Sequence, residues 1–134
     1  MMRLTTLLSA AGLALLAMPA FAQGYASGAI TSTMVDNKEV LTDANGMTLY
    51  TYDKDMVGVS NCYDECATNW PPLPATAGAE ADGYFTVVDR TDGTKMWAYK
   101  GRPLYLWGKD TKAGDMTGEG VGGTWHVAFV TPDV

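Results

Sequence analysis

The stretch Gly46-Met-Thr-Leu-Tyr-Thr-Tyr-Asp-Lys-Asp55 returns 55 residues later as Gly101-Arg-Pro-Leu-Tyr-Leu-Trp-Gly-Lys-Asp110, and five of the ten positions are identical. The same offset relates Trp70 to Trp125. Two matches at one spacing indicate an internal duplication. Each copy therefore presents the pattern Tyr-x-aromatic-x-x-Asp and, further along, a tryptophan.

The first 22 residues read as a secretory signal peptide. Arg3 supplies the positive start, Leu7 to Met18 is an apolar run, and Ala20-Phe21-Ala22 is a small-residue cleavage site. The run is shorter than the roughly 20 residues that a bilayer-spanning helix needs. We therefore expect a cleaved leader, an exported protein that is periplasmic or secreted, and no membrane insertion after cleavage.

The composition of the remaining chain limits its partners. Residues 23–134 are enough for one domain with its own core. Without Arg3 they carry 8 basic and 15 acidic side chains, a formal net charge of −7. This charge disfavours binding to nucleic-acid phosphates or to an anionic membrane surface.

The pattern of β-forming runs and turn signals predicts a mainly β fold. We expect two pseudo-equivalent three-stranded meander units, a C-terminal strand and one short helical turn at the cysteines. Within a single domain, 29–134, copy one covers 29–73 and copy two covers 84–130. The expected strands are 29–35, 38–43 and 47–52 in copy one, and 84–89, 94–99 and 104–107 in copy two, followed by 125–130.

Turns and connections complete this plan. Asn45-Gly46 is a strong hairpin signal, because both central residues of a type I′ turn need positive φ. The segment Trp70-Pro-Pro-Leu-Pro74 has prolines, which lack a backbone donor, at three of its five positions, and should run extended as polyproline II, not as an interior strand. Residues 23–28 should form a flexible start, and 74–83 should connect the copies.

Cys62 and Cys66 are the only cysteines, and export favours a disulfide between them. In a regular helix the Cβ atoms of residues four apart lie about 5–6 Å apart, whereas a disulfide needs about 3.8 Å. We therefore expect a tightened turn there, followed by a short helix within 63–69.

With these features the chain resembles a family of secreted-repeat proteins, described as predicted lipoproteins with a Yx(FWY)xxD motif. Residues 50–55 and 105–110 match that motif, and the cysteine segment with Trp70-Pro-Pro-Leu73 is similar to the family's own. The resemblance implies an exported, duplicated envelope protein without an assigned activity. The lipobox cysteine that the family description implies is absent, which favours a soluble form.

The repeated motif has a structural and a binding interpretation. The aromatic pairs share a strand face and fit either a duplicated core, which we favour, or a platform for a ligand. The acids fit carboxylates that fix the turns by accepting backbone N–H bonds and that consequently have depressed pKa values. The residues concerned are Tyr50, Tyr52, Asp55, Trp70, Tyr105, Trp107, Asp110 and Trp125.

Metal and enzyme chemistry have weaker support. Soft sulfur ligands suit Cu(I), and the weak candidates for such a site are His126, Met56 and Met116. They show no ligand-like spacing, and scattered methionines are more often core fillers. No nucleophile and base motif or phosphate loop is present. We expect no catalytic residue and no cofactor.

The sequence therefore favours a non-enzymatic envelope module that binds or scaffolds. Its partner is an envelope component or a small ligand that no motif identifies. The alternative is a periplasmic copper, haem or redox protein.

Overall fold

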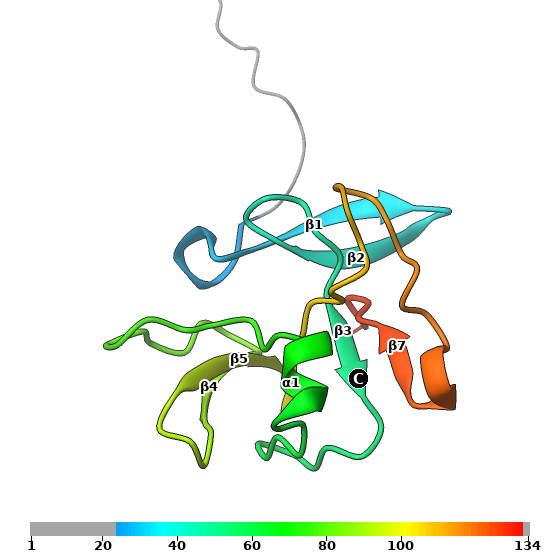
Figure 1. Ribbon diagram of the computed structural model, residues 1–134. Helices are drawn as coiled ribbons and strands as arrows, with labels where there is room; N and C mark the ends of the chain where they lie inside the picture. Colours follow the sequence, from blue (N-terminus) through cyan, green and yellow to red (C-terminus); the bar gives the residue numbers. More distant parts are fainter. Residues whose placement is uncertain (1–23, 133–134) are drawn as a thin grey trace, which may run out of the picture.

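The structure is a computed structural model that describes residues 24–132 (Figure 1). The expected signal peptide lies outside the described residues. The fold is mainly β, as predicted. In chain order the elements are η2 (Ala26–Gly28), β1 (Ile30–Val35), β2 (Lys38–Asp43), β3 (Tyr50–Tyr52), α1 (Glu65–Asn69), β4 (Phe85–Asp89), β5 (Lys95–Tyr99), β6 (Arg102–Pro103), η3 (Val121–Gly123) and β7 (Trp125–Val127).

Each copy begins with the expected antiparallel hairpin, β1–β2 in copy one and β4–β5 in copy two. The turn of the first hairpin has positive φ at both Asp36 and Asn37, the conformation that a two-residue hairpin turn requires. The Asn45-Gly46 turn differs from the prediction, because only Gly46 has positive φ. Asp43 Oδ1 instead accepts the backbone N–H groups of Asn45 and Met47, at 2.8 and 2.9 Å.

The third strand of each copy is shorter than predicted. The expected ranges 47–52 and 104–107 are replaced by β3 (Tyr50–Tyr52) and β6 (Arg102–Pro103). β6 pairs with β5 of its own copy, and Thr48 bridges Thr42 of β2 in the same way. Just after these residues the chain turns to the other copy and pairs with it. Tyr50 and Tyr105 form an antiparallel bridge with each other.

The two copies exchange their last segments. β7, at the end of copy two, pairs with β3 of copy one, and the next residues continue to β2 through a Val40–Phe129 bridge. In the same way Pro72 and Pro74 of copy one form bridges with Tyr105 and Met96 of copy two. The sequence copies are therefore not the structural halves, since each copy completes the sheet of the other.

The segment Trp70–Pro74, which the sequence predicts not to be an interior strand, does form backbone hydrogen bonds with copy two. Leu73 donates its N–H to the carbonyl of Leu104 at 2.9 Å and accepts from the N–H of Trp97 at 3.0 Å. It is not a regular strand, because three of its neighbours are prolines without donors. The donors that remain, on Leu73 and Ala75, both bond to copy two.

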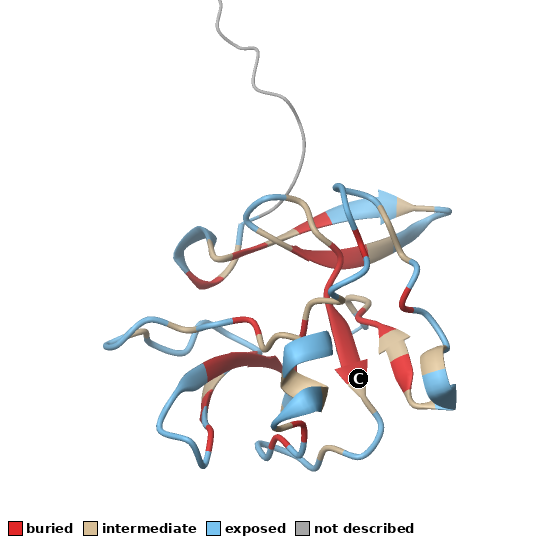
Figure 2. Ribbon diagram, viewed as in Figure 1, coloured by how far each residue is buried: buried red, intermediate tan, exposed pale blue. Residues whose placement is uncertain are grey.

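Two clusters of buried side chains fill the interior. One contains Trp97 and Leu104, and the other contains the repeated tyrosines and tryptophans. Figure 2 shows burial concentrated along β3, β5 and β7, whereas the loops around them are exposed. The repeated tyrosines and tryptophans of both copies therefore pack together in the second cluster.

Within residues 23–28, for which the sequence predicts a flexible start, Tyr25 and Ala26 make specific contacts. Tyr25 exchanges two backbone hydrogen bonds with Ile30, at 2.8 and 3.3 Å, and its hydroxyl donates to Glu39 at 3.2 Å. Ala26 is buried, and its N–H donates to Asp82 of the connector at 2.8 Å. These hydrogen bonds join the segment to β2 and to the connector.

The disulfide joins Cys62 to Cys66, as expected, with their Cα atoms 5.3 Å apart. Cys62 precedes α1, and Cys66 lies in its first turn. Asp64 between them has positive φ, so the backbone is tightened and not helical there. This confirms the geometric argument from the sequence.

The exchange of segments predicts how the chain behaves when it is cut. A chain split between Gly78 and Ala79, in the connector, should give two fragments that are each unfolded alone, because each lacks the strand that completes its sheet. Mixing them in equal amounts should restore the dispersed NMR spectrum of the intact protein. A monomeric fragment that folds alone would contradict the exchanged architecture.

Candidate functional site

The two motif tyrosines lie side by side at the centre of the molecule. Tyr50 N–H donates to the carbonyl of Tyr105 at 2.8 Å, and Tyr105 N–H donates to the carbonyl of Tyr50 at 2.9 Å. Both side chains are fully buried. Because the motif tyrosines are equivalent in the duplication, this pair marks a pseudo-twofold axis that relates the copies.

Each motif carboxylate binds the tyrosine of the other copy. The Tyr50 hydroxyl donates to Asp110 Oδ2 at 2.6 Å, and the Tyr105 hydroxyl donates to Asp55 Oδ2 at 2.7 Å. The Oδ1 atoms accept backbone N–H groups, Asn61 for Asp55 at 2.7 Å and Thr117 for Asp110 at 3.0 Å. Each acid therefore closes its own loop, as expected, and also joins the two copies.

The expected depressed pKa of Asp55 is wrong in sign. Burial raises the pKa of this carboxyl above its ordinary value, although the hydrogen bonds from Tyr105 and Asn61 and the charge of Arg90 act in the opposite direction. Burial and the bond to Asp55 also raise the pKa of Tyr105, and burial and the bond to Asp110 raise the pKa of Tyr50. For Asp55 the loss of water around this half-buried carboxylate outweighs the hydrogen bonds that it accepts.

The remaining motif aromatics form one stack of four rings. Trp70 stacks on Trp125 with a centroid distance of 3.8 Å and parallel planes. At one end of the stack Trp107 packs on Trp70, with their ring centroids 3.9 Å apart. At the other end Tyr52 packs on Trp125, with their ring centroids 4.3 Å apart. The pseudo-twofold axis maps this stack onto itself, because Trp107 is equivalent to Tyr52 and Trp70 to Trp125.

This arrangement accounts for the repeated motif by packing. Trp70 and Trp125 are 4% and 5% exposed, and only the end rings of the stack, Tyr52 and Trp107, are half-buried. The hydroxyls of Tyr50 and Tyr105 are hydrogen-bonded to Asp110 and Asp55. The motif residues thus form the centre of the core and do not present an open aromatic platform.

Arg90 belongs to the same hydrogen-bond network, although no motif of the sequence predicts a site there. It is 5% exposed, and its guanidinium donates to Ser60 Oγ at 2.7 Å and to the carbonyl of Cys62 at 2.8 Å. Ser60 in turn bonds to the Tyr105 hydroxyl at 2.6 Å. The only available signal was a single arginine at the end of the apolar run Phe85-Thr-Val-Val-Asp89, which also fits a surface position.

The weak metal candidates have different surroundings. His126 bonds through Nε2 to Asp53 at 2.9 Å and through Nδ1 to Glu119 at 3.1 Å, and these carboxylates raise its pKa. Met56 is 67% exposed, whereas Met116 is half-buried against the motif core. Within residues 24–132 no group of three or more His, Cys, Asp or Glu side chains is arranged to hold a metal ion.

The tyrosine hydroxyls should contribute measurably to stability. Tyr50→Phe and Tyr105→Phe each remove the hydroxyl that donates to Oδ2 of a motif carboxylate, and we expect each to lower the free energy of unfolding by about 1–3 kcal/mol. Tyr52→Phe is the matched control, because its hydroxyl has no hydrogen bond among residues 24–132; its effect should stay within about 0.5 kcal/mol. Urea unfolding measures all three, and equal effects would contradict the assignment.

The pH dependence of stability should separate Asp55 from Asp115. The folded pKa of Asp55 is raised, so its contribution is largest in acid and is lost as the pH rises through that pKa. The pKa of Asp115 is lowered from 3.8 to about 2 by the N–H of Thr111 and by Lys112, so its contribution is present above pH 3.8 and is lost as the pH falls towards 2.

Acidification should therefore increase the stability of the wild type relative to Asp55→Asn and decrease it relative to Asp115→Asn. Thermal or urea unfolding followed from about pH 2 upwards gives both differences, because the series begins well below the ordinary pKa of a carboxyl group. Parallel trends for the two variants would refute the desolvation of Asp55.

Comparison with known proteins agrees with the duplication. A family model described as a secreted repeat of unknown function matches the chain twice, at residues 31–74 and 86–129. No curated protein and no solved structure matches the chain. Among the described residues no helix is long and apolar enough to cross a membrane. The two matches begin and end 55 residues apart and together cover more than half of the sequence, so the chain belongs to this family of exported secreted repeats.

Proposed function

We propose that this exported protein is a non-enzymatic binding or scaffolding module, and that its contact surface is the loop Met56–Val59, here called the tip loop. The proposal rests on one observation. The side chains of Met56, Val57 and Val59 are 67%, 83% and 46% exposed, and they are adjacent in a short hairpin. Adjacent exposed apolar side chains are a feature of interaction sites, whereas isolated ones are common on any protein.

The duplication supplies an internal control for this observation. Both copies close the equivalent loop in the same way, with a motif carboxylate that accepts an N–H from Asn61 in copy one and from Thr117 in copy two. The exposed residues of the second loop are Thr111-Lys-Ala-Gly114, none of them large and apolar. The loop geometry therefore does not require the apolar residues of the tip loop.

The tip loop is also held in place. Met56 and Val59 exchange both backbone hydrogen bonds, at 3.1 and 2.9 Å, and Gly58 N–H donates to the carbonyl of Gly101 at 2.8 Å. A Cβ atom on Gly101 would lie 2.8 Å from Val57 Cγ1, so this glycine allows the loop to lie close to the turn before β6. A fixed loop loses little conformational entropy when it binds.

Site-specific photo-crosslinking in the exporting cells tests this function. A benzophenone amino acid in place of Val57 should give a covalent adduct with a partner, whereas the same group in place of Lys112, in the equivalent loop of copy two, should not. Adducts of equal yield from both positions, or none from position 57, would contradict the proposal. The mass of the adduct reports the partner.

A further inference from the structure

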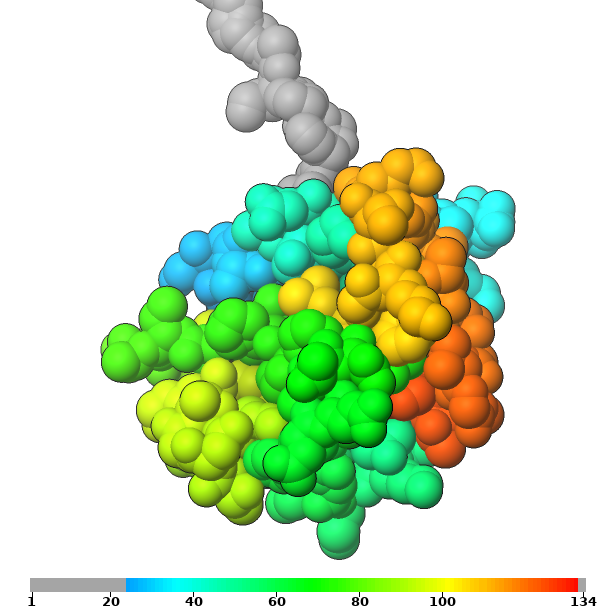
Figure 3. Space-filling model, viewed as in Figure 1, coloured from blue at the N-terminus to red at the C-terminus, as the bar shows by residue number. Residues whose placement is uncertain are grey.

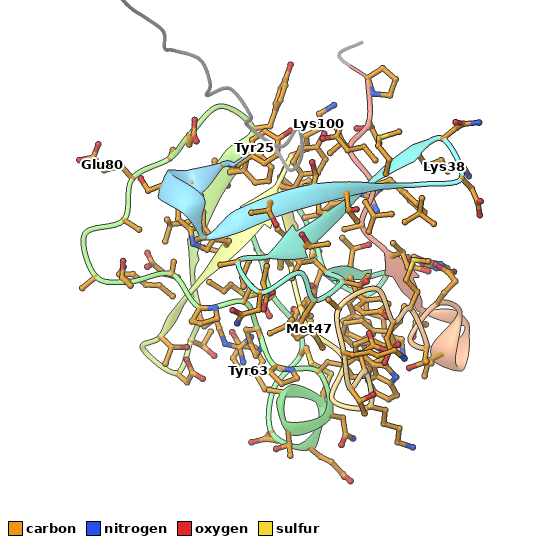
Figure 4. All side chains as sticks on the ribbon, turned by 90° about the horizontal axis from the view of Figure 1, so that it is seen from above. Tyr25, Lys38, Met47, Tyr63, Glu80 and Lys100 are labelled. Atoms are coloured by element: carbon orange, nitrogen blue, oxygen red, sulfur yellow. A yellow bond between two sulfur atoms is a disulfide. The ribbon has the colours of Figure 1, made fainter. Side chains whose placement is uncertain are left out.

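A groove lies on another side of the molecule, between η2 and residues 74–82 of the connector. It has a volume of about 730 Å³, and its walls are mostly Ala, Gly, Ser, Thr and Pro, with Trp97 among the lining residues. Figure 4 shows the connector, labelled at Glu80, as an arm on the same side of the molecule as the N-terminal turn. The hydrogen bond from Ala26 N–H to Asp82, at 2.8 Å, ties the turn to the connector.

The groove is acidic, and the tip loop is flanked by basic residues. Glu80 and Asp82 line the groove, and no basic residue does. Lys54 precedes the tip loop, and Arg102 follows Gly101, to which the loop is bonded. Neither of these two side chains has an ion-pair partner among residues 24–132. The acid nearest in sequence, Asp55, is occupied by Tyr105.

The tip loop and the groove therefore match in polarity and in charge. One is a small apolar projection flanked by cations, and the other is a hollow with small side chains flanked by carboxylates. The tip loop lies at the lower edge of the molecule in Figure 3, whereas the connector and η2 lie at the left in Figure 1. The two cannot fill each other within one chain.

The geometry points to a second copy of this chain as the partner of the tip loop, which inserts into the groove of the neighbouring molecule. The contact is head to tail, so each molecule keeps a free tip loop at one end and a free groove at the other. Such a contact builds open chains or rings and not closed dimers. This inference specifies the partner of the surface proposed above and rests on that proposal.

Opposite charges around the contact should make the assembly sensitive to salt. The whole chain is strongly acidic, with a formal net charge of −6, so copies repel each other except where Lys54 and Arg102 meet the carboxylates. Sedimentation velocity of the exported chain at concentrations up to about 0.5 mM covers the range of weak self-association. It should show oligomers that grow with concentration and shrink when the salt is raised.

Two variants each remove one half of the contact. Val57→Glu places a negative charge on the tip loop, which the carboxylates of the groove repel, and Thr76→Trp fills the groove from an exposed position of the connector. Each should weaken self-association about tenfold or more, the effect of losing a central interface contact. Ala113→Glu, in the equivalent loop of copy two, is the matched control and should associate like the wild type. Circular dichroism verifies that the variants fold.

The decisive measurement mixes the two variants. Val57→Glu retains an intact groove and Thr76→Trp an intact tip loop, so the mixture should form a one-to-one dimer and nothing larger. A mixture that stays monomeric would overturn the inference, as would a wild-type chain that is monomeric throughout. If Thr76→Trp associates like the wild type while Val57→Glu does not, the tip loops meet each other and the groove is not involved.

The inference and the proposed function fail differently. Adducts from position 57 with another protein, in a chain that does not self-associate, would leave the proposed function standing and overturn the second copy as partner. Binding of the wild type, and not of Val57→Glu, to anionic phospholipid vesicles would likewise replace the second copy by a lipid surface.

Discussion

The hydrogen bonds between each motif tyrosine and the motif aspartate of the other copy are the interaction on which the rest of the structure depends. Tyr50 and Tyr105 pair through their backbones at the pseudo-twofold axis, and their hydroxyls reach across it to Asp110 and Asp55. The carboxylates then fix the loops that follow each strand. One motif thus sets the register between the copies, the direction of the loops and the position of the tryptophan stack.

Because both copies contribute to each half, the core is under a constraint that the loops do not share. A change at a motif aromatic affects the central stack of both halves at once, since Trp70 and Trp125 contact each other directly. The loops behind Asp55 and Asp110 need only present one backbone N–H to the carboxylate. They are free to differ, and the apolar tip loop of copy one is the point of difference that supports a role in binding.

Much of the fold can be predicted from the sequence because its signals are local. The 55-residue repeat, the hairpins β1–β2 and β4–β5 and the disulfide follow from spacing and turn residues. The exchange of the last segments cannot be predicted in this way, because a strand pattern does not identify its partner. The pKa of Asp55 and the buried position of Arg90 depend on desolvation and on neighbours from distant parts of the chain.

A double-mutant cycle tests the central claim most directly, which is that the motif residues act across the copies. Tyr50→Phe combined with Asp110→Asn should show a coupling of about 0.5–3 kcal/mol in the free energy of unfolding, as expected for groups in one hydrogen bond. Tyr50→Phe combined with Asp55→Asn, within one copy, should be additive within about 0.5 kcal/mol. Coupling within a copy and additivity between copies would contradict the exchanged contacts.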